Sequence, residues 1–351
     1  MCGHEGTRPM QKRLSAGLIG TIAVSVLFSI PAAAQDYYAG KTIDFVIGGN
    51  PGGGFDIYAR ALSRHLSRHI PGRPAIVAKN MPGAGSTKAG IHVSTIAAKD
   101  GLTIGAVTPG AITGPLLEGK PTLFVPNKVT WIGSANSSTR ICAVYETSKI
   151  RSFDDALTQK FILAGGSHGD ATHDYAHMLR KITAPNAINV TGGYKGTLDQ
   201  TLAMERGEAD GMCGWDWSSA KSQKPEWIRD RKIRIVLQIG PRPNAELTQA
   251  GAAEFWKYVK GDENRQIAQL IVSQQDFQRP YFVASGTPVE YADILRKAFD
   301  ATMTDPQFVA DATKMRIDVS PLPGADVQKL IEDFFAAPKA IVEQARRVIR
   351  P

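Results

Sequence analysis

The sequence predicts an α/β protein made of two units, each with a mainly parallel sheet flanked by helices. Apolar runs rich in β-branched residues alternate with amphipathic helical runs along most of the 351 residues. This alternation is typical of strand–helix–strand units. The pattern runs from about residue 42 to 110 and begins again at about residue 161. A hydrophobic content of 43% is enough for two cores, so we expect two domains.

Each unit is expected to contain several strand–loop–helix repeats. In the first unit we expect strands at 42–48, 75–79 and 103–107, helices at 56–70 and 89–98, and a loop at 80–86. In the second unit we expect strands at 161–164 and 187–190, loops at 165–171 and 191–196, helices at 172–182 and 198–206, and an apolar segment at 209–213.

Two strand-rich stretches are candidates for connections that cross between the units. They lie at 129–145 and 281–284, and helices dominate from Pro288 to the end, with Pro338 breaking the last one. The expected first lobe therefore spans residues 35–140 with part of about 282–351. The expected second lobe spans residues 141–281.

Residues 1–34 have the pattern of a secretory signal peptide. Lys12 and Arg13 precede an apolar stretch at 14–30, and the segment ends in Pro-Ala-Ala-Ala at 31–34. We expect cleavage after Ala34 and export to the periplasm. A retained membrane anchor is the alternative, because the apolar stretch is about as long as the shortest membrane spans.

The formal net charge of +8 comes from basic residues that are scattered along the chain. Nucleic-acid binding is not expected from this distribution, which favours anionic small molecules or a membrane-bound partner. In an oxidising compartment Cys142 and Cys213 can pair. Two buried thiols in separate strands are an equally good interpretation, because sequence gives no distance.

A glycine-rich loop, GNPGGGFD at 49–56, follows the first expected strand and precedes the first expected helix. A helix start leaves about four N–H groups unpaired and attracts anions, and glycines let a ligand approach the backbone. Asp56 suits an N-cap or first-turn position. A tight turn that binds nothing is the alternative. Phosphate binding is not favoured, because neither the P-loop lysine nor the third glycine of a dinucleotide fingerprint is present.

Three further loops of the same kind follow expected strands: PGAGS at 82–86, TPG at 108–110 and GGSHG at 165–169. Ligands of open parallel sheets bind beyond the carboxyl ends of the strands. Bare loops at that edge in both units predict a cleft lined with backbone donors.

The sequence resembles the substrate-binding proteins of tripartite tricarboxylate transporters, the Bug-type receptors, and the likeness covers nearly the whole chain after residue 34. The matching stretches are PGGGFDIYARAL at 51–62, NMPGAGSTKAG at 80–90, KDGLTIGAVTPG at 99–110, GGSHGDAT at 165–172, GGYKGTLDQTLAMERGEADGM at 192–212 and FVASGTPVEYADILRKAF at 282–299. The resemblance implies a two-lobed periplasmic binding protein, type II-like. It further implies a receptor that closes around an organic mono- or dicarboxylate and delivers it to a membrane permease.

In that family, two loops hold the carboxylates of the ligand through main-chain amides and ordered waters. The match implies one wall formed by Gly53, Gly54, Phe55 and Asp56, and another formed by Ser167, Gly169, Ala171 and Thr172. Ala171 replaces a family glycine. The ligand-binding set that we expect is completed by Gly85, Ser86, Thr108, Pro109 and Trp215.

Two residues near the second wall have more than one interpretation. Trp215 and Trp217 either line the cleft and favour a flat or long acid, or pack in the core. We expect no cofactor, no metal and a monomer.

Two catalytic or metal-binding alternatives arise from the same region. The run at 165–169 also spells G-x-S-x-G, so an exported esterase using Ser167 is the principal alternative; however, the last histidine is His177, and such an enzyme needs its base later in the chain. His173 and His177 lie four residues apart and could share zinc, but no third ligand is evident. Solvated helix surface is the favoured interpretation of this pair.

Overall fold

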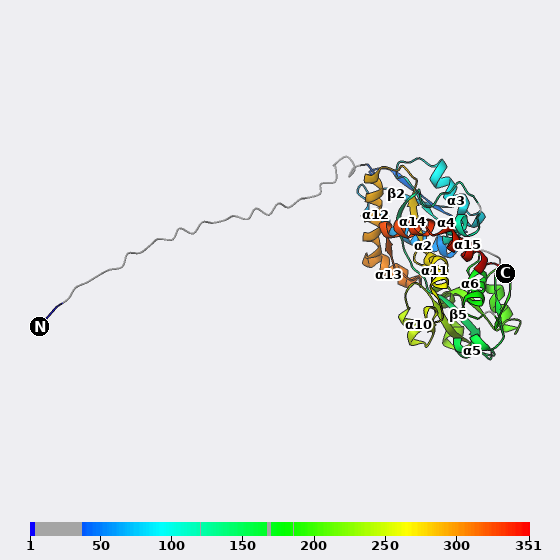
Figure 1. Ribbon diagram of the computed structural model, residues 1–351. Helices are drawn as coiled ribbons and strands as arrows, with labels where there is room; N and C mark the ends of the chain where they lie inside the picture. Colours follow the sequence, from blue (N-terminus) through cyan, green and yellow to red (C-terminus); the bar gives the residue numbers. More distant parts are fainter. Residues whose placement is uncertain (4–36, 120, 167–169, 185) are drawn as a thin grey trace.

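The computed structural model describes residues 1–3, 37–119, 121–166, 170–184 and 186–351. Two six-stranded sheets, each flanked by helices, form two lobes (Figure 1). The predicted α/β fold with two lobes is therefore confirmed.

The first sheet combines a parallel half with an antiparallel half. Its order is β12-β4-β11-β3-β1-β2. The strands are β1 (Thr42–Ile47), β2 (Ala75–Asn80), β3 (Thr103–Ala106), β4 (Thr130–Ser134), β11 (Pro280–Val283) and β12 (Leu322–Pro323). β1 pairs in parallel with β2 and β3, whereas β11 is antiparallel to β3 and β4, and β12 is antiparallel to β4.

Helices cover both faces of this sheet. They are α2 (Gly54–Leu66), α3 (Thr87–Ile91) with a π-helical turn at His92–Ile96, α4 (Pro109–Leu117), α12 (Val289–Met303), α13 (Pro306–Lys314) and α14 (Gly324–Phe335). Short 3₁₀ turns lie at Ser67–His69 and Ala84–Ser86. α2 buries Tyr58, Leu62 and Leu66 on one face, which is the spacing expected of an amphipathic helix.

The second sheet has the order β10-β9-β5-β8-β6-β7. Its strands are β5 (Arg140–Tyr145), β6 (Phe161–Ala164), β7 (Ile188–Thr191), β8 (Gly211–Asp216), β9 (Ile233–Ile239) and β10 (Ala253–Glu254). β6 is parallel to β7 and β8, and β9 is parallel to β10, whereas β5 is antiparallel to both β8 and β9.

The helices that flank the second sheet come mainly from the middle of the chain. They are α5 (Phe153–Thr158), α6 (Ala171–Ile182), α7 (Thr197–Glu205), α8 (Trp217–Gln223), α9 (Pro225–Arg229), α10 (Ala245–Gln249) and α11 (Asp262–Val272), with 3₁₀ turns at Phe255–Lys257 and Ser273–Gln275. The last helix, α15 (Lys339–Val348), packs against α11 and α6 and also against α4 of the first lobe (Figure 1). Pro338 precedes it as its N-cap.

Both sheets are mixed rather than mainly parallel. The antiparallel pairs involve the strands next to the crossings, β4, β5 and β11. A strand that arrives from the other lobe enters the sheet from the edge where the parallel strands end, so it runs against them. The crossings therefore impose the antiparallel pairs.

Two short segments connect the lobes side by side. The N–H of Ser138 donates to the carbonyl of Gln275 at 2.9 Å, and the N–H of Gln278 donates to the carbonyl of Asn136 at 3.0 Å. The expected crossing at 129–145 is thus present, between β4 and β5. The second crossing lies just before the expected stretch at 281–284, because β11 is already part of the first sheet.

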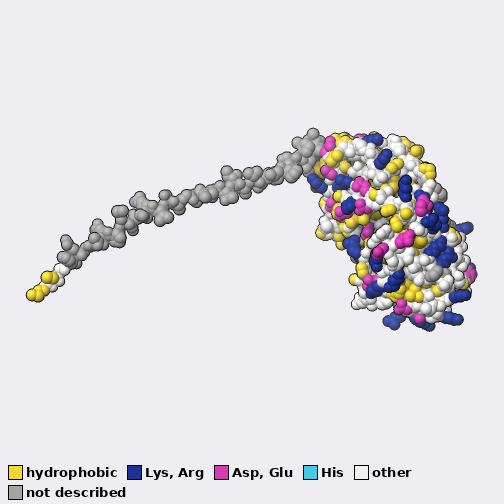
Figure 2. Space-filling view, in the orientation of Figure 1, with side chains coloured by type: hydrophobic (Ala, Val, Ile, Leu, Met, Phe, Trp, Pro, Cys, Tyr) yellow, Lys and Arg dark blue, Asp and Glu magenta, His cyan; other side chains and the backbone are white. Residues whose placement is uncertain are grey.

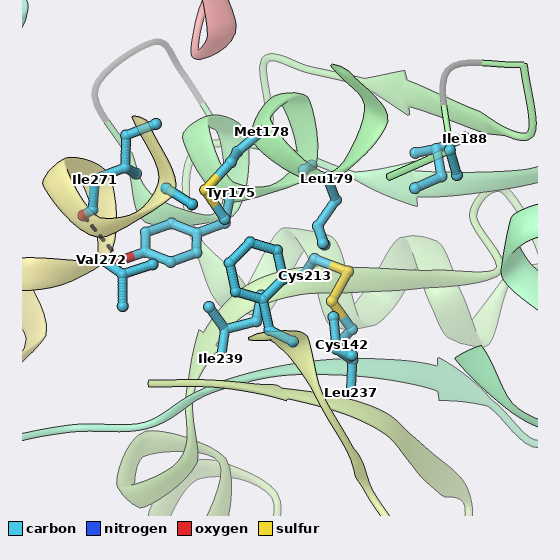
Figure 3. Packing of buried hydrophobic residues seen from close by; sticks show 14 of the residues in the cluster. Cys142, Tyr175, Met178, Leu179, Ile188, Cys213, Leu237, Ile239, Ile271 and Val272 are labelled. Carbon is cyan, nitrogen blue, oxygen red and sulfur yellow. Dashed lines mark hydrogen bonds between the residues drawn. A yellow bond between two sulfur atoms is a disulfide. The ribbon is translucent and has the colours of Figure 1, made fainter. Parts of the chain in front are cut away.

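A disulfide joins β5 to β8 in the core of the second lobe. Cys142 and Cys213 are paired in the strand register, with Cα atoms 4.0 Å apart (Figure 3). Tyr175 of α6 belongs to the same buried cluster, and its hydroxyl donates to the carbonyl of Ile271 in α11 at 3.3 Å. Of the two interpretations of the cysteines, the structure contains the disulfide.

The surface is mixed in charge. Figure 2 shows Lys and Arg side chains spread over both lobes, with Asp and Glu side chains among them. Within the described part of the chain, no helix is both long and apolar enough to span a bilayer.

Candidate functional site

A cavity of about 790 Å³ lies between the lobes. Residues of the first lobe form one side of it, and Arg140, Asp170 and Ala171 of the second lobe form the other. Gln274 and Gln278, from the second crossing segment, also line it. The first-lobe lining residues include Phe55, Ala84, Gly85, Thr87, Thr108, Pro109 and Gly110.

The start of α2 is shaped by the glycine loop. Gly53 is the N-cap and has no side chain to bond the first amides of the helix. The carboxylate of Asp56 instead accepts the N–H of Gly52 at 2.8 Å, and it also accepts from Arg60 at 2.7 Å and Asn80 at 2.9 Å. Burial raises the pKa of Asp56, but these hydrogen bonds outweigh burial and leave the pKa lowered. Asp56 thus fixes the loop.

The segments that follow β1, β2 and β3 are fastened to one another by side-chain hydroxyls. Ser86 donates to the carbonyl of Gly48 at 2.8 Å, and Thr108 donates to the carbonyl of Gly85 at 2.8 Å. Ala84 and Ser86 have positive φ values of 46° and 78°. Such conformations cost energy for residues with a side chain and persist where neighbours enforce them, often at ligand sites.

On the opposite side, the start of α6 is held by Thr172. Its hydroxyl oxygen accepts the N–H of Gly166 at 3.1 Å and the amide of Gln200 at 2.7 Å. Ala171 is the first residue of α6 and has no positive φ. The alanine at this position therefore imposes no backbone strain.

Three helices have a residue of their first turn in the lining of the interlobe cavity: Phe55 of α2, Pro109 of α4 and Ala171 of α6. The first amides of a helix have no intrahelical acceptor, and the N-terminal end carries about half a positive charge. In α4, however, Pro109 has no N–H, and the N–H of Ala111 donates to the Thr108 hydroxyl oxygen at 3.3 Å. Glu118 and Asp170 also line the cavity, and both have interaction partners. Attraction for an anion therefore comes from the helix starts and from Arg140.

Arg140 lines the cavity, and hydrogen bonds hold its guanidinium in place. It donates to the side chain of Gln278 at 3.2 Å and to the carbonyl of Gly214 at 3.4 Å. Arg279 lies nearby, over the rings of Phe55 and Tyr58 at 4.5 and 4.7 Å.

Asp216 balances these two cations. It is 7% exposed and accepts from the hydroxyl of Ser218 at 2.6 Å and the N–H of Ser219 at 3.0 Å. Burial raises its pKa, but Arg140, the Ser218 hydroxyl and Arg279 favour the charged form and lower the pKa to about 2. Asp216 is therefore a carboxylate at neutral pH.

The predicted ligand-binding residues divide into several groups. The interlobe cavity is lined by Phe55, Gly85, Thr108, Pro109 and Ala171. Gly85 and Thr108, together with Ser86, also line a neighbouring first-lobe pocket of about 490 Å³. Thr172 and Trp215 line a second-lobe pocket of about 240 Å³.

Some of the remaining predicted residues line none of these three spaces, and the others lie outside the residues that the structure describes. Gly53 and Gly54 are exposed at the start of α2, and a Cβ on Gly54 would lie 3.3 Å from the Arg279 guanidinium. Asp56 points into the loop that it fixes. Ser167 and Gly169 lie outside the described residues.

Both tryptophans are mainly core residues. Trp215 is 1% exposed and meets Trp227 edge to face, with ring centroids 6.5 Å apart. Trp217 is 5% exposed, and its indole N–H donates to Glu246 at 2.8 Å. Trp217 lines a separate groove on the hinge that does not share a residue with the interlobe cavity.

Sequence reasoning missed Arg140, Gln274 and Gln278. None belongs to a motif, and each lies at a crossing whose position was known only approximately. One signal was available: Arg140 stands at the start of the strongly apolar stretch at 141–144, directly where the chain leaves the first lobe. Arginine is almost never fully buried unless it is paired, so an arginine at this position indicates a polar surface or a partner there.

The prediction that His173 and His177 lie on solvated helix surface is wrong. They are 5% and 4% exposed, because α6 is covered by β7 and β8 on one side and by α15 on another. His173 bonds the side chain of Asp174 at 2.9 Å. Among the residues that the structure describes, no group of three His, Cys, Asp or Glu side chains could hold a metal ion.

Comparison with solved structures finds the same fold in solute-binding proteins. A TctC solute-binding protein from Polaromonas is 15% identical with a TM-score of 0.68, covering 88% of this chain and 99% of that one. The periplasmic binding protein BugD is 18% identical with a TM-score of 0.60, covering 89% and 98%. MatC from Rhodopseudomonas palustris, solved with bound malate, is 17% identical with a TM-score of 0.57, covering 88% and 99%.

The chain therefore has the two-lobed periplasmic binding protein fold of TctC and BugD. At these identities the likeness establishes the fold and not the ligand. No protein-family model and no curated protein matches the sequence.

Proposed function

We propose that this protein is a solute receptor of the tripartite tricarboxylate transporter type, which binds an organic mono- or dicarboxylate between its lobes without changing it chemically. The observation that carries the proposal is the convergence of three helix starts, from both lobes, on one cavity. The fold and the malate-bound relative of the same fold agree with it.

Binding and closure are coupled in this proposal. A carboxylate that contacts amides of α2 and α6 at once is held by both lobes only when the lobes are close. The ligand therefore stabilises the closed state over the open one. A micromolar dissociation constant corresponds to about 8 kcal/mol, which several amide–carboxylate hydrogen bonds in a water-poor cavity can supply.

We further propose that the receptor works in the periplasm as a monomer and passes its ligand to membrane permease subunits. The signal-peptide pattern at residues 1–34 supports export. The Cys142–Cys213 disulfide also supports an oxidising compartment, since disulfides are rare in the cytosol.

A thermal-shift screen against aliphatic and aromatic acids tests the receptor function. A true ligand at 100 times its dissociation constant adds about 2.7 kcal/mol of stability. Small-angle X-ray scattering of the same samples should show a smaller radius of gyration with the ligand. A response to no acid contradicts the proposal.

The esterase alternative is tested separately with an activated ester of a short-chain acid. A receptor hydrolyses it no faster than buffer does, both as wild type and as Ser167→Ala. Turnover that Ser167→Ala abolishes would establish the esterase instead.

A further inference from the structure

A smaller pocket in the second lobe adjoins the interlobe cavity. Its volume is about 240 Å³, and Arg140, Asp170 and Ala171 line both spaces. A ligand held in the interlobe cavity can therefore extend into this pocket. Its other lining residues include Thr172, Lys195, Gln200, Trp215 and Asp216.

Three of the lining residues carry buried polar atoms that have no hydrogen-bond partner in the described part of the chain. They are Nε of Arg140, Oε1 of Gln200 and Nε1 of Trp215. Gln200 and Trp215 are each 1% exposed. An unsatisfied buried polar group costs about 1–3 kcal/mol, so such groups are uncommon and need an explanation. Their concentration around one pocket indicates a bound group that pairs with them.

The side chains are held so that they cannot satisfy these atoms among themselves. The amide nitrogen of Gln200 already donates to Thr172, at 2.7 Å. The terminal nitrogens of Arg140 donate to Gly214 and Gln278. Trp215 is fixed by its edge-to-face contact with Trp227. The pocket is thus preorganised, with two N–H donors and one carbonyl acceptor left over.

The unpaired atoms of the pocket argue against a second carboxylate in it. A carboxylate accepts hydrogen bonds from N–H groups, but it has no hydrogen to donate to Oε1 of Gln200. A carboxamide is neutral, accepts through its oxygen and donates through its nitrogen.

We propose that the second-lobe pocket is a subsite for a carboxamide at the far end of the ligand. Its oxygen accepts from Arg140 and Trp215, and its nitrogen donates to Gln200. The proposal rests on the proposed function, because the carboxylate end occupies the interlobe cavity. It narrows the ligand class to carboxylates that carry a terminal amide.

Calorimetric titration with two matched series tests the subsite. The six-carbon series is hexanoate, adipate and adipic acid monoamide; the four-carbon series is butyrate, succinate and succinamate. In wild type, we expect one of the monoamides to bind at least about tenfold more tightly than the monoacid of equal length, as two or three added hydrogen bonds allow.

Two variants remove the pocket's polar atoms, and one tryptophan serves as the matched control. Trp215→Phe and Gln200→Met should each lower the ratio of monoamide to monoacid affinity about fivefold or more. Trp217→Phe should leave that ratio unchanged, because its indole N–H pairs with Glu246 and it lines another groove. The monoamide and the monoacid are compared on the same variant, so a smaller folded fraction changes both affinities equally and leaves their ratio unchanged. The result for either variant alone therefore tests the subsite.

The outcomes separate this proposal from the receptor function. If acids bind but neither monoamide has an advantage, the subsite is refuted and the receptor function stands. If a diacid binds most tightly and Trp215→Phe weakens the diacid, the pocket takes a carboxylate and the proposal is overturned. If no acid or amide of either series binds and the wider acid screen is also negative, both proposals fail.

Discussion

The two lobes present different chemistry to the space between them. The first lobe offers mainly main chain: the lining loops at Gly85 and Thr108 have little side chain and are fastened by hydroxyl–carbonyl hydrogen bonds. The second lobe offers fixed side chains, above all Arg140 and Gln200, with polar atoms left unpaired. Main-chain N–H groups donate to any carboxylate, whereas side chains discriminate between ligands. Under the proposed function, the first lobe supplies general affinity and the second lobe supplies selectivity.

The lobes also differ in covalent structure. The second lobe contains the Cys142–Cys213 bond, with a sequence separation of 71, whereas residues 37–134 and 280–351 contain no cysteine. Closing a loop of that length contributes about 4 kcal/mol in the chain-entropy model. We expect the double substitution of both cysteines by alanine to cost about that much, measured by urea unfolding.

Hydrogen exchange on the same variant locates the effect. Protection should fall most at β5 and β8 and least at β1 and β2. A decrease in unfolding free energy below about 1 kcal/mol, or an equal loss of protection in both lobes, would contradict the claim that the disulfide stabilises the second lobe.

Asp216 supports the side chains of the second lobe. Asp216→Asn keeps an acceptor for Ser218 and Ser219 but leaves Arg140 and Arg279 without a balancing charge. We expect a loss of about 3 kcal/mol, as is usual when one partner of a buried charge cluster is removed. The control is Asp333→Asn, an exposed partner of Lys329 at 2.9 Å, which should change stability by less than about 0.5 kcal/mol. Equal effects of the two substitutions would refute this role.

Acid should remove the stabilisation that Asp216 provides beside Arg140 and Arg279 over a defined pH range. The pKa of Asp216 is lowered from 3.8 to about 2, so its contribution is complete above about pH 4 and is lost as the pH falls toward 2. That contribution is about 2 kcal/mol. The stability difference between wild type and Asp216→Asn should therefore shrink between pH 4 and pH 2. A difference that stays constant over this range would show that the carboxylate is not held in its charged form.

Substitution of two glycines distinguishes the effect of backbone strain from the effect of a lost ligand contact. Gly85, at the cavity, and Gly207, after α7, have φ values of +59° and +71°, and a Cβ at either position meets nothing within 4 Å. Substitution by alanine should cost about 1 kcal/mol of stability in both cases. Titration with a bound acid should show weaker binding only for Gly85→Ala. Equal affinities of the two variants would argue against a first-lobe contact.

Much of the fold could be predicted from local sequence. Strands followed by glycine loops, such as β1 and β6, could be recognised in the sequence. The apolar run that forms the buried strand and the glycines that form the turn lie within a few residues of each other. β9 (Ile233–Ile239) was not predicted, since no motif follows it. The antiparallel pairing of β5 also could not be predicted, because it depends on where the chain crosses between the lobes.

The site was predictable where it consists of loops and unpredictable where it consists of isolated side chains. Phe55, Thr108 and Ala171 lie in motifs and line the cavity. Arg140 depends on a crossing whose geometry is set by the packing of both lobes. The burial of His173 has a similar cause, since α15, which covers α6, lies far away in sequence.

The crystal structure of the protein with a bound carboxylate tests most directly whether both lobes grip one anion. We predict carboxylate oxygens within hydrogen-bonding distance of first-turn amides of α2 or α4 on one side and of α6 or Arg140 on the other. A ligand that touches a single lobe, or that binds outside the interlobe cavity, would contradict the account.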